Sequence, residues 1–462
     1  MTETAVTPRR PGSIELPDLA AALLCVMVLL APALWNGYPL LQYDTGGYLA
    51  RWYEGYLVPS RSTVFALYLH AGEGFHFWPQ LVLQAGCVIW LIRLVLRVFG
   101  FGTSPWRLVI IVTSLSVLTA LPVLSSMLLT DIFAGLAVLS LHLLVFHREH
   151  LRPIERLGLF WLIAFGAATH SATLAVLLAV LVFSIPALLL SNLNVVVRLL
   201  PAGGAIAAGA AMLLAANFAL SGQLAWTPGG FGIAFGRMLQ DGIVKRYLDD
   251  HCPDARLKLC PYRNELPRNA DEFLWSYGIF NDLGRFDGLG EEMRFIVLRS
   301  VQAYPLQQIG TALAATANQL RLVETGHGNH DRIWHTYGII KRFIGGEVPA
   351  MQKARQQRGE LSFELINRVH VPIALGSMVL LLALLANALV CGRFDAPIRL
   401  AATVTVALLA NAFVCGALSG PHDRYGARIV WIATLAAAIE VLQAIRSLAA
   451  ERADKARSAV VP

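Results

Sequence analysis

One aspartate near the start of the chain, Asp44, combines a reactive residue type with an unusual position. It lies in the polar segment Tyr43-Asp44-Thr45-Gly46-Gly47-Tyr48. That segment follows an apolar run, 16–35, of about the length that crosses a bilayer. A carboxylate at a water–lipid boundary can act as a general base toward an alcohol. The alternative is that Asp44 is a turn residue ahead of the two glycines.

Other ionisable residues occupy comparable positions at the ends of later apolar runs. Asp131 opens the fourth run, His170 lies between the fifth and sixth, and His422, Arg424 and Tyr425 lie in the segment that joins the ninth and tenth. Ionisable side chains at membrane depth are costly and are usually functional. With Asp44, they all fall on one side of the predicted membrane.

Each of these residues also has a structural explanation. Asp131 could be an N-cap whose charge lies at the positive end of a helix. His170 could be a hydrogen-bonded core histidine. Arg424 could be an interfacial residue that extends its charged end to water. The joint occurrence on one side is therefore more informative than any one of them.

The group as a whole favours transfer from a lipid phosphate to a hydroxyl. Arginine, with histidine beside it, can hold a phosphate by charge-assisted hydrogen bonds. We expect Arg424, His422, Tyr425 and Arg61 at the phosphate, Asp44 as the base, and Asp131 and His170 in support. The chain has no Walker-type loop, dinucleotide fingerprint or Gly-x-Ser-x-Gly elbow.

The elements that must position these residues are membrane helices. Of 462 residues, 56% are hydrophobic and 15% charged, with a net charge of +7, whereas soluble domains carry about 25% charged residues. The arginines cluster in short loops, so the charge indicates membrane topology and not nucleic-acid binding. We predict an all-α polytopic protein with ten spans, at 16–35, 78–98, 108–121, 132–146, 157–168, 172–190, 199–220, 369–390, 398–418 and 429–447.

The arginine distribution orients these spans. Outside the long segment 221–368, the segments on the N-terminal side contain most of the basic residues: Arg9, Arg10, Arg93, Arg97, Arg107, Arg148, Arg152, Arg156, Arg198, Arg393, Arg399, Arg446, Arg452, Lys455 and Arg457. The short loops on the other side contain Arg51, Arg61, Arg424 and Arg428. The asymmetry predicts both termini in the cytoplasm, in the cell (inner) membrane, and the site on the extracytoplasmic face.

This topology divides the chain into five parts. We expect a cytoplasmic tail at 1–15, a transmembrane module at 16–220 with its first outside loop at 36–77, an extracytoplasmic and mainly helical domain at 221–368, a second transmembrane module at 369–447, and a cytoplasmic tail at 448–462. The first span should be uncleaved. Helix breaks are expected around Pro122, His170 and Pro186. Segment 63–71 should be a surface helix, and 302–323 an amphipathic helix of the outside domain.

Two of the six cysteines differ from the rest. Cys25, Cys87, Cys391 and Cys415 lie in or beside apolar runs, where a thiol packs as a small hydrophobe. Cys252 and Cys260 flank a polar heptapeptide in the predicted outside domain. In an oxidising compartment they should form a disulfide. A zinc site with the adjacent His251 is the alternative, although it would lack an evident fourth ligand.

The pattern resembles the GT-C-type integral membrane glycosyltransferases, which include protein mannosyltransferases and aminoarabinose transferases. The matching features are Asp44 in the first outside loop, Asp131 at the outer start of the fourth span, and His422-Asp423-Arg424-Tyr425 before the last span. The resemblance implies that Asp44 is the catalytic base and that Arg424 with His422 contacts the phosphate of a polyprenyl-phosphate sugar. The acceptor would be a hydroxyl of an extracytoplasmic glycan, lipid or protein.

The chain departs from that group in two respects. The group often has an acidic pair in the first loop, whereas Thr45 follows Asp44 here. Whether the protein requires a divalent metal therefore stays open. The large outside segment lies between spans seven and eight and not at the C-terminus. Two other functions remain possible: a transporter or flippase of lipid-linked sugars, and a non-catalytic membrane assembly subunit.

Overall fold

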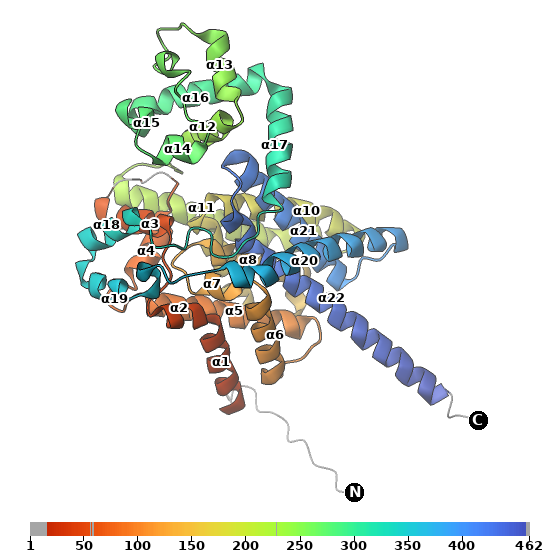
Figure 1. Ribbon diagram of the computed structural model, residues 1–462. Coiled ribbons are helices and arrows are strands. Elements are labelled where there is room, and N and C mark those ends of the chain that lie inside the picture. Colours follow the sequence, from red (N-terminus) through yellow and green to blue (C-terminus); the bar gives the residue numbers. More distant parts are fainter. Residues whose placement is uncertain (1–15, 56, 58–59, 228, 459–462) are drawn as a thin grey trace.

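The computed structural model describes residues 16–55, 57, 60–227 and 229–458 of the chain (Figure 1). The predicted cytoplasmic tail at 1–15, with Arg9 and Arg10, and the last residues, 459–462, lie outside the described part. Within the described residues the protein is all-α and contains no strand. An isolated bridge between Leu40 and Met127 is the extent of the β-type pairing there.

Six helices in the described part are long and apolar enough to cross a membrane, which indicates a multi-pass membrane protein. They correspond to predicted spans two, six, seven, eight, nine and ten. Their bounds are α5 Trp78–Val98, α10 Ser171–Leu190, α11 Val195–Ser221, α20 Glu364–Cys391, α21 Ala396–Ala412 with its π-helical extension η5 Phe413–Ala417, and α22 Asp423–Ser458.

The other four predicted spans are shorter helices. They are α1 Leu16–Leu29, α6 Pro105–Leu118, α8 Asp131–Phe146 and α9 Pro153–Thr169. The first run is interrupted because Leu30 leaves the α1 helix and a second helix, α2 Ala31–Asn36, begins there with proline in its first turn. Every residue of α8 is buried, so this helix lies in the middle of the bundle and brings Asp131 with it.

The predicted breaks have different outcomes. Pro122 lies in the first turn of a separate short helix, α7 Leu121–Ser125. His170 leaves the helical path between α9 and α10. Helix α10, in contrast, continues through Pro186.

Shorter helices fill the connections between the long ones. They are α3 Tyr43–Glu54, α4 Thr63–His70, α12 Gly230–Gln240, α13 Ile243–His251, α14 Ala270–Trp275, α15 Ile279–Asp282, α16 Arg285–Ala303, α17 Pro305–Gln319, α18 Trp334–Phe343 and α19 Val348–Gln352. Single 3₁₀ turns are η1 Arg148–His150, η2 Cys260–Tyr262, η3 Gly345–Glu347 and η4 Arg355–Arg358. Helix α4 is the helix expected at 63–71, but five of its eight residues are buried.

The predicted outside segment, 221–368, divides between two hydrophobic cores. Residues 235–304 contribute to a core of their own, built around Phe235, Leu248, Phe280 and Met293. Residues after Val323 pack instead into the main core with the long helices. In Figure 1 the first part, α12 to α16, stands apart from the bundle, whereas α18 lies beside α3.

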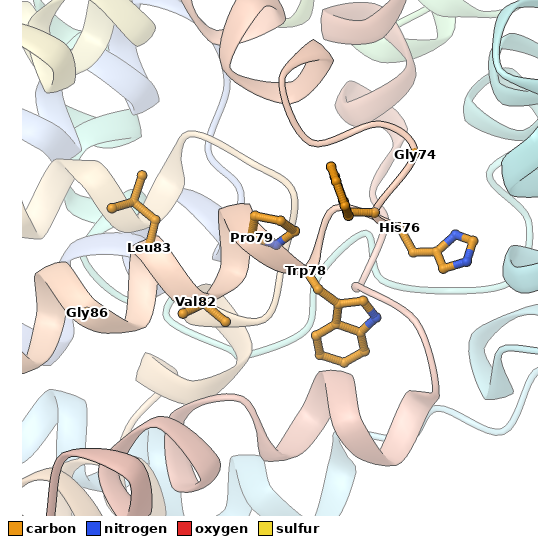
Figure 2. A pocket seen from close by; sticks show the side chains of 8 residues that line it. Gly74, His76, Trp78, Pro79, Val82, Leu83 and Gly86 are labelled. Carbon is orange, nitrogen blue, oxygen red and sulfur yellow. The ribbon is translucent and has the colours of Figure 1, made fainter. Parts of the chain in front are cut away.

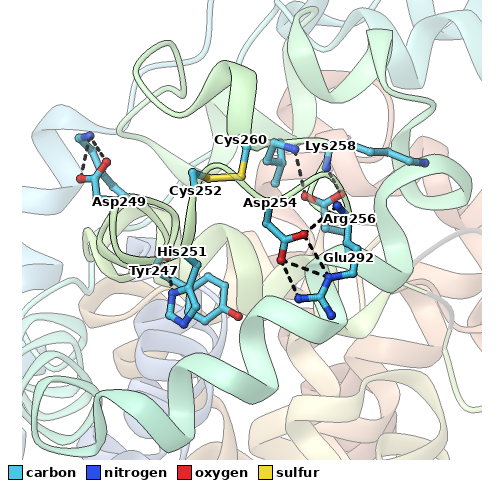
Figure 3. Close-up of a disulfide and its surroundings, with 11 residues drawn as sticks. Tyr247, Asp249, His251, Cys252, Asp254, Arg256, Lys258, Cys260 and Glu292 are labelled. Carbon is cyan, nitrogen blue, oxygen red and sulfur yellow. Dashed lines mark hydrogen bonds and ion pairs between the residues drawn. A yellow bond between two sulfur atoms is a disulfide. The ribbon is translucent and has the colours of Figure 1, made fainter.

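Cys252 and Cys260 form a disulfide in this separate part (Figure 3). His251 donates from Nδ1 to the Tyr247 carbonyl (2.8 Å) and stacks on the Tyr247 ring. The loop that the disulfide closes is also attached to α16, because the Glu292 carboxylate accepts the backbone N–H of Lys258 at 2.9 Å. The sulfur atoms are therefore engaged with each other, as the disulfide prediction required, and not with a metal.

Candidate functional site

Asp44 lies in the first turn of α3. Gln42 caps this helix: its side chain accepts the Asp44 backbone N–H (2.8 Å), and the Thr45 hydroxyl accepts the Gln42 N–H (3.1 Å). The free N–H groups of a first turn stabilise a carboxylate there. Asp44 is thus a helix residue, and the turn proposed for it is the N-terminus of α3.

Two arginines from distant parts of the chain hold the Asp44 carboxylate. Arg61, from the segment before α4, binds Oδ1, and Arg424, in the first turn of α22, binds Oδ2 at 2.9 Å. The local sequence makes room for Arg61. A Cβ on Gly47 would lie 2.9 Å from the Arg61 Nε, so the absence of a side chain there lets the guanidinium cross α3.

The preceding glycine has a separate packing role. A Cβ on Gly46 would lie 2.6 Å from the Thr336 Cα of α18, too close for any side chain. Thr336 uses this proximity, since its hydroxyl accepts the Gly46 N–H (3.0 Å) and donates to the Gln42 carbonyl (2.8 Å). Helix α18 therefore fixes the N-terminus of α3, and with it the position of Asp44.

Arg424 also contacts a second carboxylate, that of Asp131 at the N-terminus of α8, through its Nε (3.5 Å). Gly135 allows α8 and α22 to approach closely, because a Cβ there would lie 2.6 Å from the Trp431 indole nitrogen. Asp131 is buried, and neither of its carboxylate oxygens accepts a hydrogen bond in the described structure. The ion pairs around it are thus longer than direct hydrogen bonds.

A third arginine, Arg428, completes the group one turn further along α22. It is fully buried, donates to the Asn411 side-chain oxygen (2.7 and 3.0 Å) and to His170 Nδ1 (3.2 Å), and lies 3.9 Å from Asp131. We refer to Asp44, Asp131, Arg61, Arg424 and Arg428 as the charged cluster. His170 borders it, and its pKa is lowered by burial and by the arginines Arg428 and Arg424.

The charged cluster keeps Asp44 ionised. Burial alone would raise the pKa of Asp44, but Arg61 and Arg424 outweigh it and lower the pKa to about 2. With His170 neutral, three guanidinium groups face two carboxylates. Counted with both carboxylates ionised, the five charged groups sum to one positive charge, in a place that is largely shielded from solvent.

The remaining predicted residues lie at the edge of the cluster. The Arg424 guanidinium lies over the Tyr425 ring, 4.9 Å from its centroid. His422 points elsewhere: its Nε2 is 3.4 Å from the Asp271 carboxylate of α14, and its ring stacks on that of His327. The structure therefore brings Asp44, Asp131, Arg61, Arg424 and Tyr425 together, with His170 beside them, and leaves His422 as a bridge to the disulfide-bearing part.

Sequence reasoning placed Arg428 in an outside loop and missed its role. The reason is that α22 begins at Asp423, six residues before the predicted start of the tenth span at 429. Arg424 and Arg428 are four residues apart, which places both on one face of a helix, and this spacing was a usable signal. His335 of α18 was also missed; burial and Arg61 lower its pKa, while Asp44 acts in the opposite direction. No local pattern pointed to it.

In the part of the chain that the structure describes, no three His, Cys, Asp or Glu side chains gather closely enough to hold a metal ion. Asp44 and Asp131 both face arginine, which competes for the same oxygen atoms. The possible divalent metal therefore gains no set of ligands from these residues.

An apolar hollow of the surface lies away from this cluster. It has a volume of about 850 Å³ and lies along the first turns of α5, between His76 and Gly86 (Figure 2). Val82 and Leu83 line it, and its surface is apolar. A small cavity of about 10 Å³ does reach Arg424, beside His327. We place the candidate site at the charged cluster, because charge and ionisable side chains are concentrated there and not in the hollow.

The chain has no detectable relative among the proteins with which we compared it. No protein-family model matches it, and neither the curated proteins nor the solved structures give a match.

Proposed function

We propose that this protein is a membrane glycosyltransferase of GT-C-like architecture, with ten membrane-crossing segments. It would move a sugar from a polyprenyl-phosphate donor to a hydroxyl of an extracytoplasmic glycan, lipid or protein. The observation that carries the proposal is the shared position of Arg424, which contacts the Asp44 and Asp131 carboxylates at once. A guanidinium between two carboxylates can exchange one of them for a phosphate without leaving its place.

The net charge of the cluster supports this choice of donor. A sugar linked to a polyprenyl phosphate is a phosphodiester with one negative charge. The cluster has one net positive charge, so a donor phosphate beside Arg424 and Arg61 would leave the site neutral. Buried charges are stable when they are paired. The six long apolar helices agree with a substrate that is carried in the bilayer.

Asp44 would take the proton in the reaction. The acceptor hydroxyl oxygen attacks the anomeric carbon, the bond from that carbon to the phosphate oxygen breaks, and polyprenyl phosphate leaves with the electron pair. The hydroxyl proton passes to Asp44. In the resting state the low pKa of Asp44 makes it a weak base. When the donor phosphate replaces the Asp44 carboxylate as the partner of Arg424, the pKa of Asp44 rises and the carboxylate becomes a better base.

The first test is donor binding. Arg424→Gln removes the charge of the side chain and leaves a shorter polar one that can still donate a hydrogen bond. A hydrogen bond to a charged group contributes about 1.5–3 kcal/mol, so donor affinity should fall by roughly 10- to 150-fold. Binding of polyprenyl-phosphate-linked hexoses and pentoses to the purified protein in nanodiscs would be measured. The matched control is Arg342→Gln, an exposed arginine on α18 that lies 3.7 Å from Glu54.

Equal donor affinity in the wild type and in Arg424→Gln, with both folded, would show that Arg424 does not bind the donor phosphate. Loss of affinity in both arginine variants would point to general electrostatic attraction and not to a defined site.

A structural role is the alternative that the same geometry supports. Ion-pair networks that only hold helices together also shift pKa values, and the cluster does join α3, α8 and α22. A transporter of lipid-linked sugars or a non-catalytic assembly subunit would use it in that way. In either of these proteins, Asp44→Asn should keep its function whenever the fold survives.

A further inference from the structure

Helix α17 has a composition that is unusual for a helix outside the long apolar set. Its fifteen residues, Pro305–Gln319, include no charged side chain. In Figure 1 it leads from α16, in the disulfide-bearing part, down to the bundle near α21. It is the helix of the described chain that connects these two parts after α16.

Two glutamines of α17, one near each end, contact other parts of the protein. Gln307 accepts a hydrogen bond from Arg246 of α13 (2.9 Å). At the other end, the Gln319 side chain donates to the His422 carbonyl and accepts the His422 N–H, both at 2.9 Å. These two glutamines therefore bind other segments of the molecule and do not face the medium alone.

The opposite side of α17 is apolar and uncovered. Leu306, Ile309 and Leu313 are 84%, 57% and 65% exposed, respectively. Their spacing of three and four residues places them on one face. Gly310 belongs to the same face, since a Cβ there would meet nothing within 4 Å.

This arrangement is the reverse of a helix on a water-soluble domain, which turns its apolar stripe to the core and its polar face to water. A continuous exposed apolar face indicates that the medium outside is lipid or another protein.

Lipid is favoured because the face continues onto a membrane helix. The inner side of α17 packs on the end of α21, where a Cβ on Gly416 would lie 2.8 Å from the Ala315 carbonyl oxygen. On the same α21–η5 segment, Leu409 and Phe413 are about half exposed. This segment is one of the six candidate spans, so its exposed side chains are the ones that a bilayer would surround.

At its α16 end, the apolar face is bordered by the combination of apolar and basic side chains that is expected at the level of lipid headgroups. Leu298 and Val301, at the end of α16, are both about half exposed. Between them Arg299 extends over the Phe295 ring, 5.6 Å from its centroid. An arginine that covers an aromatic ring with its stem while its charge reaches outward is typical of the membrane interface.

We propose that α17 lies on the bilayer, with Leu306, Ile309, Gly310 and Leu313 in contact with lipid beside the end of α21. The disulfide-bearing part is thereby anchored to the membrane surface next to the charged cluster. This inference depends on the membrane helices and not on the proposed glycosyl transfer.

Spin-label accessibility in lipid nanodiscs tests it. Cys25, Cys87, Cys391 and Cys415 are replaced by serine or alanine, and the disulfide is kept. A nitroxide is placed at Leu306→Cys, Ile309→Cys or Leu313→Cys. The matched control is Glu291→Cys on α16, whose side chain is 90% exposed. At the α17 positions, collisions with oxygen should exceed those with a water-soluble nickel complex, and Glu291→Cys should show the reverse.

Two results would overturn the proposal. Nickel accessibility at the α17 positions equal to that at Glu291→Cys would place the face in water. An immobile label that neither reagent reaches, with dipolar broadening between labelled copies, would assign the face to a second copy of the chain. Three positions are used so that one poorly folded variant does not decide the outcome.

Discussion

Ion pairs in the charged cluster differ in sequence separation from those in the disulfide-bearing part, and in burial from the exposed pairs there, although Arg237 and Asp241 of α12 form a local pair that is also buried. Asp44 and Arg424 are 380 residues apart in sequence, and both side chains are less than one-fifth exposed. In the disulfide-bearing part, Lys245 pairs with Asp249 one helical turn away, and both are about half exposed. The first kind of pair requires the whole bundle to form, whereas the second requires a single helix.

This difference in burial has an energetic meaning. Exposed pairs contribute about 0–1 kcal/mol, because water and salt screen them. Removing one partner of a buried pair costs about 3–5 kcal/mol, because a charge is left without compensation. A costly cluster of five charged groups in a membrane bundle calls for a role beyond stability. The exposed local pairs of the other region, such as Lys245 with Asp249, call for none.

The largest stability effect should follow the removal of Arg428. Arg428→Met keeps the volume but leaves Asp131 with Arg424 as its one remaining cationic neighbour within 4 Å in the described structure. We expect a loss of about 3–5 kcal/mol, measured by unfolding of the purified protein in detergent. The double variant Arg428→Met/Asp131→Asn should recover part of this loss. A single-variant cost below about 1 kcal/mol would show that the cluster behaves like a surface pair.

The disulfide should have the next largest effect, confined to its own region. Cys252→Ser with Cys260→Ser opens a loop of eight residues' separation, and the expected cost is about 2–3 kcal/mol. Because residues 235–304 form a separate core, hydrogen exchange should accelerate in α12 to α16 and stay unchanged in α3 and α8. Equal acceleration in both regions would show that they unfold as one unit.

The smallest effect should come from a local pair. Lys245→Gln removes a partner of Asp249 on the surface of α13, and the expected cost is about 0.3–0.5 kcal/mol, which added salt would reduce further. The midpoint of urea or thermal unfolding, with and without salt, measures this effect. A cost above 1 kcal/mol would remove the contrast between the two regions.

Much of the architecture follows from hydropathy along the chain. The apolar runs that became α5, α10 and α20 have the length and composition of bilayer-crossing helices, which is a local property. The break after Leu29 could not be read in the same way, because the apolar run continues through Trp35 while the helix is interrupted at Leu30. Capping and tertiary contacts decide such boundaries.

The candidate site was predictable as a set of residues but not as a geometry. A topological argument places Asp44, Asp131 and Arg424 on one side of the membrane. It cannot state that Gly47 lets Arg61 cross α3, since that requires the packing of two segments. His422 shows the same limit: it precedes Arg424 by two residues, yet it turns to Asp271 because α22 begins between them.

The central claim is that Asp44 accepts the proton of an acceptor hydroxyl. The most direct measurement is sugar turnover by purified Asp44→Asn in nanodiscs, with a radiolabelled polyprenyl-phosphate sugar and an envelope extract as the source of acceptor. Asp423→Asn, the same change on the first residue of α22, is the control. We predict a fall in turnover of roughly 10²–10⁴-fold for Asp44→Asn, with donor binding retained and Asp423→Asn near the wild type. Near-normal turnover in folded Asp44→Asn would contradict the account and leave the charged cluster a structural role.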